Sequence, residues 1–166
     1  MVTLHEHLPL EHAYSAEDAR RRLRDVLRSD PVAEVRREAA LALGSAGLAA
    51  AGNVEALVDA VEDPSFVVRA AAIRALGRHR QPRAVDVLVE TLESRGELWQ
   101  EASAALAATG DVEVVPRIVP LLRSPRTQAR RGALRALAAL AAGDASASVD
   151  PLLGYTDEAG VRHALF

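Results

Sequence analysis

The apolar residues of this chain recur in a helical pattern at spacings of 30 to 33 residues. Each copy opens with an apolar residue followed by arginine or tryptophan: Val35-Arg36, Val68-Arg69, Leu98-Trp99, Ala129-Arg130 and Val161-Arg162. Four copies continue with apolar residues four, seven and eight positions later: Val35/Ala39/Ala42/Leu43, Val68/Ala72/Ala75/Leu76, Leu98/Ala102/Ala105/Leu106 and Ala129/Ala133/Ala136/Leu137. Those offsets share one face of an α-helix, and a fixed period of this length is typical of a repeat array. The pattern therefore predicts one amphipathic helix in each repeat.

A second apolar pattern precedes the first in each of three units. Its sets, offset by three, four and seven positions, are Val54/Leu57/Val58/Val61, Val85/Leu88/Val89/Leu92 and Val115/Ile118/Val119/Leu122. Each unit is therefore expected to be a pair of antiparallel helices. Turns within the pairs are indicated at Asp30-Pro31, Asp63-Pro64, Ser94-Arg95-Gly96 and Ser124-Pro125, and glycines 44, 77, 110 and 143 are expected to cap helix C-termini.

These elements predict a single repeat domain over residues 16–166, preceded by a polar segment, 1–15. Its units are expected at about 16–47, 53–79, 82–109, 111–142 and 147–166. Ser15 and Asp18 have the spacing of a capping box at the first helix. The last unit stops early, so either the chain is a fragment or this edge meets another protein or another copy. We expect self-association through the edge that contains Leu165 and Phe166.

The sequence Asp-Pro-x-x-x-Val-Arg-x-x-Ala-x-x-Ala-Leu-Gly occurs at residues 30–44 and 63–77. It resembles the HEAT-repeat family, and the short period resembles its phycobilin-lyase-like branch. The resemblance implies an all-α fold, a right-handed α-solenoid of about five helical hairpins. It also implies a structural ladder of aspartate and arginine between neighbouring units, for which the matching residues are Asp30, Arg36, Asp63 and Arg69.

The ladder pattern changes in the later units. Trp99 takes the arginine position of the third unit and Glu93 the acidic position, while Ser124 replaces the acid before Arg130. Arg130 is therefore expected either to form a weaker contact or to be available to a ligand. Trp99, the only tryptophan, has the large apolar area and single donor of an interface anchor, or else fills an interface that lost its ion pair.

The resemblance further implies that the second helices of the units line the concave surface. Their outward positions are expected to be Arg37/Ala70/Gln100/Arg131, Glu38/Ala71/Glu101/Gly132 and Leu41/Arg74/Ala104/Arg135. Because guanidinium groups pair well with carboxylates, an acidic helix or tail of a partner protein is the expected ligand. The predicted binding residues are Trp99, Arg74, Arg131, Arg135, Arg37 and Gln100. A solvated basic stripe explains the same arginines.

Charge adds a constraint on the partner. The net charge is −3, yet residues 66–139 hold 12 arginines and 7 acidic residues, whereas residues 1–65 hold 7 and 12. A solvated face is the favoured interpretation of this central excess, which can also steer an anionic partner, and a pI near 6.0 argues against a dedicated nucleic-acid binder. The chain has no cysteine and no run of eighteen apolar residues, so we expect a cytoplasmic protein without a membrane span.

Three histidines in the first twelve residues, His5, His7 and His12, alternate with carboxylates. They are candidate ligands for zinc or iron, although a polar segment that covers the first helix is the simpler interpretation. No catalytic motif and no cofactor are predicted. The sequence thus favours an interaction scaffold or adaptor. The alternatives are a phycobilin-lyase-like enzyme or enzyme accessory, and a nucleic-acid-binding protein that uses the central arginines.

Overall fold

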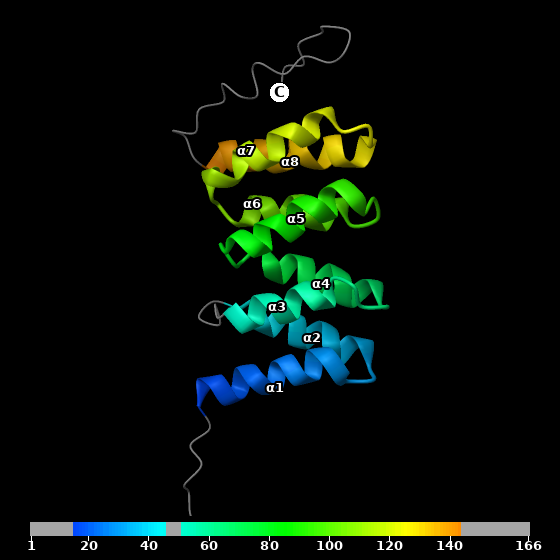
Figure 1. Ribbon diagram of the computed structural model, residues 1–166, viewed down its shortest axis with the longest axis vertical. Helices are drawn as coiled ribbons and strands as arrows, with labels where there is room; N and C mark the ends of the chain where they lie inside the picture. The colour runs from blue at the N-terminus through cyan, green and yellow to red at the C-terminus, as the bar shows by residue number, and fades with distance from the viewer. Residues whose placement is uncertain (1–14, 46–50, 144–166) are drawn as a thin grey trace, which may run out of the picture.

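The computed structural model describes residues 15–45 and 51–143, which form four stacked helical hairpins (Figure 1). The helices are α1 (Ala16–Ser29), α2 (Ala33–Leu43), α3 (Ala51–Ala60), α4 (Phe66–Leu76), α5 (Pro82–Ser94), α6 (Trp99–Ala108), α7 (Val115–Ile118) and α8 (Thr127–Gly143). The described part of the chain contains no strand, which confirms the predicted all-α class. The predicted fifth unit and residues 1–14, with His5, His7 and His12, lie outside the described residues. No described helix is both long and apolar enough to cross a membrane.

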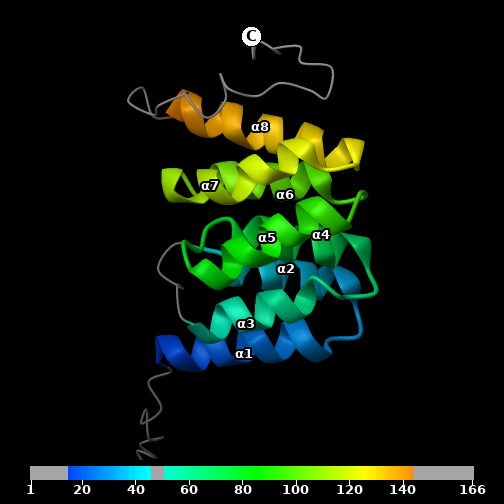
Figure 2. The same cartoon turned by 45° about the horizontal axis from the view of Figure 1, so that its top comes forward.

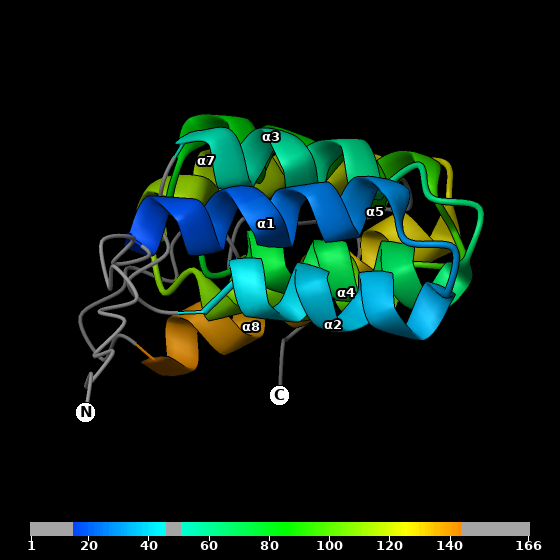
Figure 3. The same ribbon diagram turned by 90° about the horizontal axis from the view of Figure 1, so that it is seen from below.

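The hairpins build two layers, which are separated when the stack is viewed along its long axis (Figure 3). The first helices, α1, α3, α5 and α7, form one layer, and the turned view shows them following one another along the stack (Figure 2). In the other layer α2 packs against α4, α4 against α6 and α6 against α8. We call this second surface the second-helix face. Repetition of one hairpin thus produces a continuous core from units that bury little surface alone.

The core consists mainly of leucine, valine and alanine. Most residues of the predicted apolar sets of the second, third and fourth units are buried, and the exceptions, Val58, Val89, Val115 and Val119, are partly buried against the core. The largest fully buried side chains include Leu43, Leu57 and Leu88. In the first unit Val35 is 42% exposed, whereas its counterpart Val68 is 0% exposed. Among the described elements, the hairpin of α1 and α2 has a neighbouring hairpin on one side only, which accounts for this difference.

Gly44 and Gly77 are the C-caps of α2 and α4, as predicted, and they have a second role. Gly44 and Gly77 have φ of −80° and −62°, which any residue adopts. A Cβ atom on Gly44 would instead lie 2.6 Å from Ala75 Cβ, and one on Gly77 would lie 2.6 Å from the carbonyl oxygen of Ala105. These glycines therefore allow successive second helices to approach closely. Only Gly110, at φ +59°, has the left-handed conformation among the described residues.

The first helix of the fourth unit is shorter than its apolar pattern predicts. Its residues divide into a 3₁₀ turn η1 (Val112–Val114), the four-residue α7 and a second 3₁₀ segment η2 (Val119–Arg123). Pro116 and Pro120 lack the backbone N–H that a continuous α-helix requires, so the regular ladder is interrupted. Ile118, Leu121 and Leu122 are nevertheless buried, so the apolar face survives the break.

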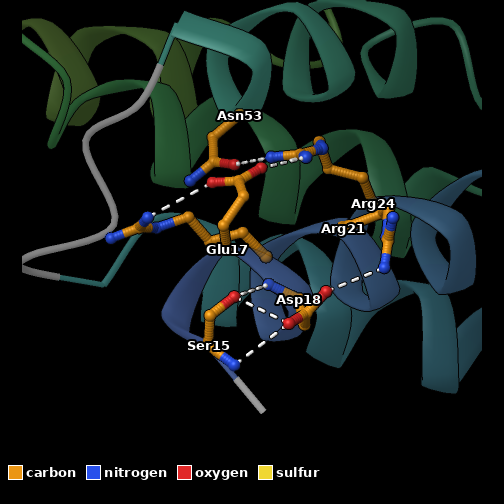
Figure 4. Close-up of polar contacts among 7 residues, drawn as sticks. Ser15, Glu17, Asp18, Arg21, Arg24 and Asn53 are labelled. Carbon is orange, nitrogen blue, oxygen red and sulfur yellow. Dashed lines mark hydrogen bonds and ion pairs between the residues drawn. The ribbon is translucent and has the colours of Figure 1, made fainter. Parts of the chain in front are cut away.

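The start of α1 has the predicted capping box, shown in Figure 4. The Asp18 amide donates to Ser15 Oγ at 3.0 Å, and the Ser15 amide donates to Asp18 Oδ2 at 3.0 Å. Arg24 then joins α1 to α3, because its guanidinium donates to Glu17 at 2.7 Å and to the buried Asn53 at 2.9 Å. These contacts align the first two hairpins.

Candidate interaction surface

The turns within the hairpins carry an ion pair between the first and second units. Arg36 Nε donates to Asp63 Oδ2 at 2.8 Å and Nη2 to Oδ1 at 2.9 Å, while Nη1 donates to the Asp30 carbonyl at 2.8 Å. Only 12% and 9% of the Arg36 and Asp63 side chains are exposed. The Asp30 carboxylate instead caps the turn by accepting the Val32 amide. The Arg36–Asp63 pair therefore ties two hairpins together across their turns.

The environment of Asp63 favours the carboxylate form. Burial alone would raise its pKa, but hydrogen bonds from Arg36 and from the Ser65 amide outweigh that effect, and the pKa is lowered below its ordinary value. The neighbouring Arg69 adds a smaller attraction. This carboxylate is thus held ionised by its structural partners.

The next contact along the ladder uses a different acid from the one predicted. Arg69 Nη2 donates to Glu97 Oε1 at 2.8 Å, and Arg69 Nη1 donates to the Asp63 carbonyl at 2.9 Å. The backbone carbonyl of Glu93 instead accepts a hydrogen bond from Arg126 Nη1 at 3.2 Å. The turn of the third unit lacks the Asp-Pro sequence, so its acid enters from just before α6 rather than from the end of α5.

Arg130 is engaged as well. Its Nη1 donates to the Ser124 carbonyl at 2.7 Å, the same bond that Arg36 and Arg69 make to the residue six positions earlier. A second nitrogen approaches Thr127 Oγ1 at 3.3 Å. Of the two expectations for Arg130, the structure favours the weaker contact, because its donors are used within its own unit.

Trp99 opens α6 and is partly buried against the hydrophobic core. The Arg131 guanidinium carbon lies 4.9 Å from the centroid of the indole ring, which is within the range of a cation–π contact. Arg131 itself is exposed on α8. The structure therefore brings together two of the predicted binding residues, one from each of two neighbouring second helices.

The other predicted binding residues are spread over the second-helix face. Arg74 on α4, Gln100 on α6 and Arg135 on α8 are exposed, and no described residue forms an ion pair with either arginine. Arg37 on α2 is partly buried and pairs with the adjacent Glu38. Arg37 thus stands apart from the surface around Trp99.

Three of the positions predicted to face outward are instead buried. Ala70 and Ala71 are 2% and 1% exposed, because α4 is enclosed between α2 and α6. Gly132 is also buried, and a Cβ atom there would collide with Leu92. The outward direction derived from a single helix fails at Ala70 and Ala71 because neighbouring helices cover both sides of α4, and it fails at Gly132 because Leu92 of α5 packs against that position.

His79, in the link that follows α4, is buried. It is 2% exposed, and its Nε2 lies 3.2 Å from the Leu43 carbonyl at the end of α2. Burial lowers the pKa of the imidazole, and the hydrogen bond to Leu43 opposes the effect only in part. Nδ1 has no hydrogen-bond partner within the described residues. The ring thus joins the first unit to the turn that follows α4.

Comparisons with known proteins agree with this architecture. The relatives include two proteins named Bilin biosynthesis protein PecE. The one from Mastigocladus laminosus is 33% identical over 109 residues, 63% of this chain and 40% of the relative. The one from Nostoc sp. (strain PCC 7120) is 33% identical over 95 residues, 56% of this chain and 38% of the relative. The chain thus spans about two fifths of the length of these relatives.

The family comparison covers the first three hairpins. The sequence profile of HEAT repeats matches residues 20–104 of the 166-residue chain. This match and the named relatives confirm the resemblance to HEAT repeats and to their phycobilin-lyase-like branch. The chain belongs to the HEAT-repeat family.

Proposed function

We propose that the chain is a protein-interaction module that binds an acidic segment of a partner on its second-helix face. The observation that carries the proposal is the stacked pair of Trp99 and Arg131, together with the exposed arginines Arg74 on α4 and Arg135 on α8. HEAT repeats generally mediate protein interactions, which supports the same conclusion. The function is recognition, without bond chemistry.

The stacked pair suits this task for a physical reason. The indole ring restrains the Arg131 guanidinium, so fewer of its conformations are lost when it donates to a carboxylate. Arg74 and Arg135 add positive charge on the flanking helices. Large aromatics and arginine are also the residue types that most often dominate binding energy at protein interfaces.

The test is retention of partners from a lysate of the source organism by wild-type and variant chains. Trp99→Ala and Arg131→Gln are expected to lose a specific acidic protein, whose direct binding is then measured with purified components. Arg21→Gln is the matched control, because this exposed arginine lies on α1 and pairs with Asp18. Helicity of each variant is measured by circular dichroism. Equal retention by the wild type and by a folded Trp99→Ala chain would contradict the proposal.

A second candidate follows from the relatives named Bilin biosynthesis protein. In this alternative the chain is an accessory that contacts a bilin or its carrier protein. The test is a change in the absorption spectrum of a free bilin on titration with the purified chain. A saturable change, retained in Trp99→Ala, would favour this second function over the adaptor.

A further inference from the structure

Arginine side chains at the two edges of the stack differ in their hydrogen-bond and ion-pair partners. Along the edge formed by turns within hairpins, Arg36, Arg69 and Arg95 pair with acids, and Arg126 and Arg130 donate to carbonyl groups. At the opposite edge, the link between α4 and α5 carries Arg78, Arg80 and Arg83, which we call the linker patch. All three are exposed, and no described residue forms a side-chain hydrogen bond or ion pair with them.

The local backbone concentrates these three charges. The chain keeps turning after α4, since the Arg78 amide donates to Ala75 and the His79 amide to Leu76. Arg83 lies in the first turn of α5, where the helix dipole adds positive potential. Arg80 reaches toward the next link, with Nη2 3.7 Å from where a Cβ on Gly110 would lie.

Within the described residues, no acidic side chain pairs with the patch. None occurs in the sequence between Asp63 and Asp86, an interval with five arginines. Asp86, the next acid in the sequence, pairs with Arg117, and Asp111 in the following link accepts the Glu113 amide and forms no ion pair with a described residue. The surface thus keeps its positive charge in a chain whose net charge is −3.

We infer that the linker patch is a second binding site, separate from Trp99, for a carboxylate-rich protein segment. Three guanidinium groups offer paired donors that match the geometry of carboxylates. The acidic pI of the chain and its five aromatic residues oppose a polynucleotide, which favours strongly basic surfaces and stacking platforms. The inference goes beyond the proposed function, because this site binds its ligand whether or not the second-helix face does.

The probe is a fluorescent oligoglutamate peptide, with an oligothymidylate of equal charge as the comparison. Binding is measured by anisotropy at low salt to the wild type and to the triple variant Arg78→Gln, Arg80→Gln, Arg83→Gln. The matched control replaces Arg21, Arg22 and Arg28 by glutamine, which changes the net charge equally on α1. Circular dichroism verifies the helicity of both triple variants.

The triple variant is expected to bind the peptide about tenfold more weakly, the combined effect of three exposed ion pairs, and added salt is expected to weaken binding. The control triple variant and Trp99→Ala should bind as the wild type does. Three results would overturn the inference: no peptide binding by the wild type, equal losses in both triple variants, or tighter binding of oligothymidylate through the same arginines. A loss in Trp99→Ala alone would also overturn it while leaving the proposed function intact.

Discussion

Replacement of Gly77 by alanine tests the close approach of successive second helices. The added Cβ would lie 2.6 Å, 2.7 Å and 2.8 Å from the O, Cα and Cβ atoms of Ala105. None of these atoms lies at the end of a flexible side chain, so the contact is relieved only if α4 and α6 separate. Ordinary contact begins at 3.4 Å, so the required shift is about 0.8 Å.

The energetic cost follows from two opposing effects. Overpacking of a tight interface costs about 1–3 kcal/mol. The backbone at Gly77 is right-handed and suits alanine. Alanine also lowers the conformational entropy of the unfolded chain, which stabilises the folded state by about 0.4–1 kcal/mol. We therefore expect Gly77→Ala to lower the free energy of unfolding by about 1–2 kcal/mol. A parallel loss is expected for Gly44→Ala, whose Cβ would meet Ala75.

The assay is urea unfolding followed by circular dichroism, with the midpoint and slope compared between variants. Gly52→Ala serves as the control, because it lies within α3 and its Cβ would meet only the Arg24 guanidinium, at 3.6 Å. Alanine there is expected to be neutral or to stabilise by up to about 1 kcal/mol. If Gly77→Ala proves as stable as wild type or more so, the close-packing explanation is refuted.

Three further predictions concern ionisable groups. Asp63→Asn or Arg36→Gln alone should each lower the urea midpoint nearly as much as both together, because either change breaks the same pair; additive losses would show that the two groups act independently. The pKa of Asp63 is lower in the folded chain than in the unfolded chain, where it is about 3.9, so ionised Asp63 stabilises the fold fully above that pH. This stabilisation is lost as the pH falls through the lower folded pKa, and Asp63→Asn should therefore reduce the acid dependence of the urea midpoint. The lowered pKa of His79 means that the unfolded chain binds the proton more readily, so stability should fall as pH drops below about 6.5; a His79→Gln variant with the same slope as wild type would contradict this.

Much of the candidate surface could be located from sequence because repeat register is a local property. Alignment of the units places Trp99 where Arg36 and Arg69 stand, although Trp99 is the first residue of α6 and the two arginines are the fourth residues of α2 and α4. The same alignment predicts Arg131 on the exposed side of α8, as observed. It contains no signal for the contact between Arg131 and the indole ring, because the two residues belong to different units.

The burial of His79 and the pairing of Arg69 with Glu97 could not be predicted from the sequence, for a related reason. The burial of His79 depends on the end of α2 lying against the turn after α4, and no sequence signal marks it. The pairing of Arg69 with Glu97 depends on how the third unit enters α6 without an Asp-Pro turn. Both are long-range contacts that a helix-by-helix pattern does not encode.

The sequence by itself determined the helical hairpins, their period and the identity of the side chains at each turn, because helical periodicity, proline turns and capping residues act within one unit. The tertiary structure alone decided which units meet and how closely. It made the C-cap residues Gly44 and Gly77 points of close contact between helices, covered Ala70 and Ala71, and placed Arg131 over Trp99. These outcomes depend on the distance between stacked helices, which all neighbouring side chains set together.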